Sequence, residues 1–91
     1  MDYEALGKYT ALTEKMLSKY SYRNMLLKKI EGIVSSSQSE LNDGLRSFNF
    51  DEAQHLFDEA ASIEKEIRQL VFDINRAARS CGKNLIQLFN N

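Results

Sequence analysis

The fold is decided by a short central stretch with two helix-boundary signals. It reads Asn42-Asp43-Gly44-Leu45-Arg46-Ser47-Phe48-Asn49-Phe50-Asp51-Glu52. Asn42-Asp43-Gly44 is typical of a helix C-terminus or turn, because glycine and asparagine tolerate the left-handed backbone that ends helices. Asn49, followed three residues later by Glu52, is typical of a capping box at a helix start. The stretch predicts a turn over about 42–49 that joins two helices into an antiparallel hairpin.

The composition supports an all-α fold in a single domain, residues 1–91. The 91 residues include no proline and only four glycines, which favours long helices. No stretch approaches the roughly 18 apolar residues that a membrane span requires, and no basic segment precedes an apolar run at the N-terminus. We therefore expect no membrane association and a cytoplasmic protein, or one exported without a cleavable signal. Cys81 is the only cysteine, which suits a reducing compartment.

We expect the first helix over about 2–41. Its apolar residues recur at steps of three and four, the spacing of a coiled-coil seam. The predicted seam comprises Leu6, Tyr9, Met16, Tyr20, Leu27, Ile30, Val34 and Leu41, with polar occupants at Thr13, Arg23 and Ser37. Four residues flank it: Tyr3, Leu12, Leu26 and Ile33. Serines over 35–39 lower helix propensity, but Val34 and Leu41 keep the phase, so we predict that the helix continues through them.

The second helix is expected over about 50–80, with a more regular seam. That seam comprises Ala53, Leu56, Ala60, Ile63, Ile67, Leu70, Ile74, Ala77 and Cys81, widened by Phe57, Val71 and Ala78. Ser80-Cys81-Gly82 marks a break, and the tail over 81–91 either continues the helix or forms a short third helix that folds back. Because these stripes are wider than one partner helix covers, we predict that two hairpins form a two-fold symmetric four-helix bundle.

The charges are strongly polarised although the net charge is only −1. Residues 31–66 hold nine acids and two bases, whereas 1–30 and 67–91 together hold ten bases and four acids. A hairpin brings the two basic flanks together, which predicts an acidic turn end and a basic open end. Such polarity has three interpretations: it steers assembly, it binds nucleic acid, or it only keeps the surface solvated.

The nucleic-acid interpretation rests on bases interleaved with tyrosine, as in single-strand binders. The residues concerned are Lys15, Lys19, Tyr22, Arg23, Lys28, Lys29, Arg76, Arg79 and Lys83. We rank it below the other two, because a pI near 5.8 is far from the basic character of such domains.

Catalytic and metal-binding patterns are weak. Glu52 and His55 have the Glu-x-x-His spacing of di-metal bundles, with Glu40 as a further ligand. The predicted seam turns His55 outward, however, so we expect no metal site. Cys81 lies on the seam, His55 is the only histidine, and no glycine-rich phosphate loop is present. We therefore predict a non-enzymatic protein without a cofactor.

In size and central turn, the chain resembles the small helical-hairpin proteins of type VII secretion. Those proteins carry Trp-x-Gly at the turn, whereas this chain has Ser47-Phe48-Asn49-Phe50 and no tryptophan. The resemblance, like a looser one to coiled-coil secretion chaperones and to small phage- or plasmid-encoded accessory proteins, concerns architecture only.

We predict a protein–protein interaction module: an adaptor, chaperone or inhibitor that forms a homodimer. Its expected anchors are the apolar residues at the two ends, which alternatively cap the bundle or fill the dimer interface. They are Phe48, Phe50, Leu85, Ile86, Leu88 and Phe89.

Overall fold

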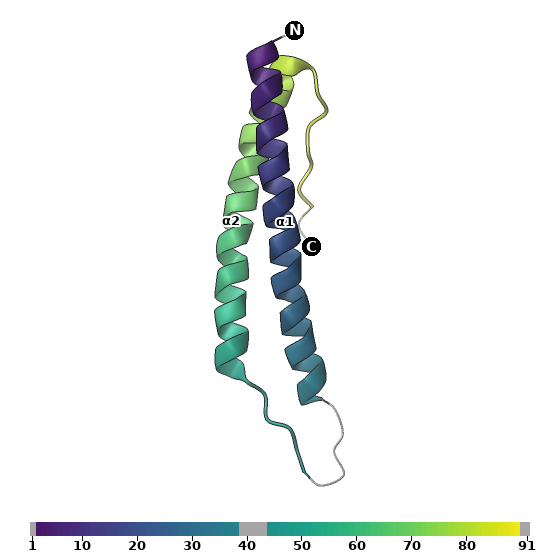
Figure 1. Ribbon diagram of the computed structural model, residues 1–91, viewed down its shortest axis with the longest axis vertical. Helices are drawn as coiled ribbons and strands as arrows, with labels where there is room; N and C mark the ends of the chain where they lie inside the picture. Colours follow the sequence, from purple (N-terminus) through teal and green to yellow (C-terminus); the bar gives the residue numbers. More distant parts are fainter. Residues whose placement is uncertain (1, 39–43, 90–91) are drawn as a thin grey trace.

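Two long helices form an antiparallel hairpin, as the sequence predicts. The computed structural model describes residues 2–38 and 44–89, with α1 at Tyr3–Ser37 and α2 at Phe50–Cys81. The molecule measures 67 × 19 × 19 Å, and the N-terminus of α1 and the C-terminal end of α2 lie together at its open end (Figure 1). Neither helix has a segment long and apolar enough to cross a membrane, within the described residues.

The tail after α2 is extended, so the alternatives of a continued or a third helix are both wrong. Residues 83–89 are non-helical and run back along the hairpin toward its middle (Figure 1). The local cause is Gly82, which caps α2 with φ of 73°, a left-handed conformation that suits glycine. The amide of Lys83 then donates to the carbonyl of Ala78 at 3.0 Å, which closes the last turn. The predicted break at Ser80-Cys81-Gly82 is confirmed.

α1 starts and ends on side-chain hydrogen bonds. The Asp2 carboxylate accepts from the backbone amide of Ala5 at 3.0 Å, an N-cap. At the other end the Ser37 hydroxyl donates to the Val34 carbonyl at 2.8 Å. Serine competes in this way for helix carbonyls, and α1 ends at Ser37, so the prediction that it continues through the serine run is wrong. The expected seam residue Leu41 and the turn signal Asn42-Asp43 lie outside the described residues.

The predicted start of α2 is confirmed, with one difference in the cap. The Asn49 side-chain oxygen accepts from the amide of Glu52 at 3.0 Å. The expected return bond, from the Asn49 backbone amide to Glu52, is replaced by one from the Asn49 side-chain amide at 3.4 Å. Together with Asp51, Glu52 also places negative charge in the first turn, where the helix dipole favours it.

The seam of α2 is the predicted one, whereas that of α1 is shifted. All nine predicted seam residues of α2 are buried or half-buried. In α1, however, Tyr20, Leu27 and Val34 are 45, 42 and 38 % exposed. The places of these three residues, and those of Leu6 and Thr13, are taken by the residues one position earlier in each heptad: Ala5, Leu12, Lys19, Leu26 and Ile33. Tyr9, Met16, Arg23 and Ile30 keep their predicted places.

The observed seam residues of each helix are labelled here as heptad positions a and d. In this labelling, the shift of the α1 seam has an electrostatic explanation. Position g of α1 holds Lys8, Lys15, Tyr22, Lys29 and Ser36, and position g of α2 holds Glu52, Glu59, Glu66, Asp73 and Ser80. In an antiparallel pair the two g lines face each other beside the seam, where such charges set orientation. The observed seam therefore sets a mostly lysine line against a mostly acidic one, an arrangement that the predicted seam does not produce.

Candidate interaction surface

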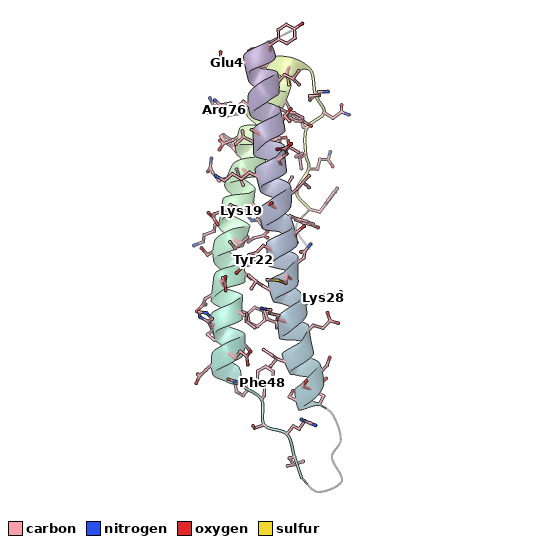
Figure 2. All side chains as sticks on the ribbon, in the orientation of Figure 1. Glu4, Lys19, Tyr22, Lys28, Phe48 and Arg76 are labelled. Carbon is pink, nitrogen blue, oxygen red and sulfur yellow. The ribbon has the colours of Figure 1, made fainter. Side chains whose placement is uncertain are left out.

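One side of the hairpin, the charged flank, consists of the two g lines. The Tyr22 hydroxyl donates a hydrogen bond to the Glu59 carboxylate, and Lys19, from position d, reaches Glu66 at 3.3 Å. Figure 2 shows Lys19 and Tyr22 between the helices. The hydrogen bond to Glu59 raises the pKa of the Tyr22 phenol above its ordinary 10.0, and desolvation adds to the effect.

Further pairs along the charged flank lie at the matching register. Lys8 and Asp73 line one surface hollow near the open end, and Lys29 and Glu52 line another near the turn. Since the Tyr22–Glu59 hydrogen bond and the Lys19–Glu66 ion pair join the two helices along this flank, we assign it to closing the hairpin in register.

The other side, the apolar flank, consists of the two e lines. They are Leu6, Thr13, Tyr20, Leu27 and Val34 in α1, and Phe50, Phe57, Glu64, Val71 and Ala78 in α2. Near the open end these residues are covered: Val71 and Ala78 are 4 and 0 % exposed. Near the turn Phe57 and Phe50 are 50 and 75 % exposed. The same stripe is thus buried in one half of the hairpin and open to solvent in the other.

A polar cluster separates the two halves. The Arg23 guanidinium donates to the Glu64 carboxylate at 2.6 Å and lies 4.6 Å from the centre of the Tyr20 ring. Arg68 reaches the same carboxylate at 3.6 Å. The side chains of Arg23 and Glu64 are only 21 and 32 % exposed, so this pair is better shielded than a surface ion pair. The cluster fixes where the covered half ends.

The tail covers the open-end half by means of Asn75. Its side-chain amide donates to the Ile86 carbonyl at 2.9 Å, and its side-chain oxygen accepts from the Ile86 amide at 2.8 Å. Ile86 itself packs against the core cluster that includes Met16 and Val71. The Asn75 side chain therefore binds both the backbone amide and the backbone carbonyl of Ile86. Because Asn75 is at position b, next to the e line, it holds the tail over the apolar flank.

The predicted anchor residues occupy three different settings. Phe48 is half-buried and meets Phe50 edge to face, with ring centres 4.6 Å apart. Ile86 is half-buried in the hairpin. The other tail residues stay open, with Leu85 48 %, Leu88 44 % and Phe89 81 % exposed.

Sequence reasoning missed Leu27, Val34 and Phe57 as surface residues, because it placed the first two in the seam and Phe57 beside it. It also missed Asn75. The signal in the sequence that indicates this surface is the apolar residues at position e of both helices.

The predicted nucleic-acid residues are dispersed by the fold. Lys19, Tyr22 and Arg23 bond to acids of α2, as described above. Lys28 lies on the side of α1 away from α2 (Figure 2), and Lys29 lines a hollow with Glu52. Arg76 lines the open-end hollow with Asp2, Glu4 and Asp73. Lys15, Arg79 and Lys83 are exposed. Acidic neighbours thus accompany five of the nine residues.

The Glu-x-x-His pattern gathers no ligand set in the part of the chain that the structure describes. Glu52 and His55 are both exposed, and Glu40 lies outside the described residues. Among residues 2–38 and 44–89, no three His, Cys, Asp or Glu side chains are grouped as a metal ion requires. Cys81 is buried, as expected for a small seam residue.

Comparison of the chain with models of protein families, with curated proteins and with solved structures gives no match in any of the three.

Proposed function

We propose that this hairpin is a non-enzymatic protein-interaction module, which offers the turn-end half of its apolar flank to a protein partner. The observation that carries the proposal is the change of exposure along one stripe. Val71 and Ala78 are covered by the chain itself, whereas Phe57 and Phe50, at the same heptad position, are not. Leu27 and Val34 extend the open area across the seam onto α1.

The energy available from covering this area is substantial. A phenylalanine side chain buries about 150–250 Å² in full, and Phe57 has half of its surface exposed. Covering that half contributes about 2 kcal/mol at the usual 25 cal/mol per Å². Contiguous apolar patches of this kind on small proteins mark interaction sites.

The test is capture of partners by the tagged protein from cells of its source, with Phe57→Glu as the disrupting variant. The matched control is Phe72→Glu, because Phe72 is 59 % exposed on the same helix but at position f, away from the apolar flank. We expect proteins, or untagged copies of the chain itself, that are retained by wild type and Phe72→Glu and lost from Phe57→Glu. Equal retention by all three proteins would refute the assignment of this surface.

A further inference from the structure

Two exposed apolar patches lie on either side of the polar cluster, one on the turn-end half of the apolar flank and one on the tail that covers the other half. The turn-end patch consists of Leu27, Val34, Phe50 and Phe57. The tail patch consists of Leu85, Leu88 and Phe89, the tail residues that stay exposed after Ile86 has packed into the hairpin. The polar cluster around Arg23 and Glu64 lies between the patches. Two patches on either side of one centre are what a two-fold interface requires.

We infer that the occupant of the turn-end patch is the tail of a second copy, in an antiparallel homodimer where each tail covers the other copy's patch. This inference rests on the proposed function and names its partner. A two-fold axis at the level of Ile63 and Glu64, perpendicular to the hairpin and lying in the interface, exchanges the turn end of one copy with the open end of the other. Each copy then contributes both a patch and a tail.

The spacing along the hairpin agrees with this axis. Asn75 holds Ile86, so the tail and α2 are level at that point. Leu88 lies two extended residues farther, about 7 Å, which corresponds to about four or five residues of helix at 1.5 Å each. Leu88 is therefore level with about residue 70 of its own α2. Phe57 precedes Ile63 by six residues, and the rotation brings it level with about residue 70 of the second copy, where Leu88 lies.

The charges select the antiparallel arrangement over the parallel one. Residues 51–59 of α2 hold four acids and no base, whereas residues 68–83 hold four bases and one acid. The two-fold rotation brings the acidic stretch of one α2 level with the basic stretch of the other; the acids lie at positions f and g, outside the interface, so they steer the approach of the two copies without pairing across it. A parallel dimer would instead align acids with acids. Complementary potentials of this kind orient encounters and penalise the wrong pairing.

The first test is the oligomeric state of the purified full chain, measured by light scattering across a dilution series. We expect a dimer that Phe57→Glu weakens at least about 30-fold, as for a central interface residue, and that Phe72→Glu leaves unchanged. Leu88→Glu, in a residue that is 44 % exposed in the single hairpin, is expected to weaken it similarly. A monomer up to about 0.5 mM, weaker than the affinity of most specific complexes, would overturn the inference.

The second test fixes the arrangement by disulfide formation, in a Cys81→Ala background that removes the native thiol. Phe57→Cys and Leu88→Cys are prepared as separate proteins and oxidised alone and as a mixture. We expect a crosslinked dimer mainly from the mixture, because residue 57 of one copy faces residue 88 of the other. Efficient crosslinking of Phe57→Cys with itself would show a parallel dimer and overturn the inference.

The two proposals fail separately. A monomeric protein that still captures a partner, lost with Phe57→Glu, removes the homodimer and leaves the interaction surface in place. If Phe57→Glu retains both the captured partner and the dimer, both proposals are refuted.

Discussion

Replacement of Asn75 by alanine tests whether the tail is held on the apolar flank. The change removes the two hydrogen bonds that Asn75 makes with the backbone of Ile86, at 2.9 and 2.8 Å. A protein hydrogen bond contributes about 0.5–1.5 kcal/mol net. Because Ile86 is only half-buried, water replaces part of each bond in the variant. We therefore expect the docked tail to lose about 1–2 kcal/mol, or about 5–30-fold in its docking equilibrium.

The assay is hydrogen exchange of the Ile86 amide, which in the wild type donates to Asn75. Exchange occurs when the tail opens, so we expect it to be about 5–30-fold faster in Asn75→Ala, with the helix content unchanged. Gln69→Ala is the control: Gln69 lies on the same helix and bonds to Asp73 in an exposed position, so its loss should leave Ile86 unaffected. Equal Ile86 exchange in wild type and Asn75→Ala would refute the role of Asn75.

Three further predictions concern the hairpin itself. Leu26 is 2 % exposed in the turn-end core; Leu26→Ala should lower the free energy of unfolding in urea by about 2–4 kcal/mol, whereas Leu17→Ala, at a site 54 % exposed, should change it by less than about 1 kcal/mol. Since the bond to Glu59 raises the pKa of Tyr22 above 10.0, an ultraviolet titration should contain an ionisation step above pH 10.0 that Tyr22→Phe removes. The stabilisation by this bond is fully present below pH 10.0 and lost as pH rises through the raised pKa. Gly82→Ala should destabilise by about 1–2 kcal/mol in thermal unfolding, because alanine is strained at its φ of 73°; an unchanged melting temperature would contradict this.

The sequence predicted the core face of α2 better than that of α1, because α2 offers only one pair of heptad positions, a and d, that is apolar throughout. In α1 the line through Tyr9, Met16 and Ile30 has apolar neighbours on both sides, at positions d and e. Nothing within α1 distinguishes Leu26 from Leu27 as a core residue. The choice depends on the acids at position g of α2, which draw the lysine line of α1 toward them. The seam of one helix was thus specified by charges on the other.

The tail could be predicted only in part. Gly82 is a local signal, and it correctly indicated the end of α2. The path that follows depends on Asn75, eleven residues away from its partner Ile86, and no periodicity relates the two. An apolar segment such as Leu85–Phe89 has the composition of a helix, but an extended chain covers more of the flank per residue.

The two flanks of the hairpin have different roles, one in joining the two helices and the other in contacting the tail. On the charged flank, the Lys19–Glu66 ion pair and the Tyr22–Glu59 hydrogen bond close the hairpin within one molecule and favour the observed register of the helices. The apolar flank has no such internal partner on α1 or α2, so the chain supplies one from its own tail. The described part of the tail lies beside the open-end half, where Asn75 holds Ile86. In the proposed dimer, the turn-end half is covered by the exposed side of the other copy's tail.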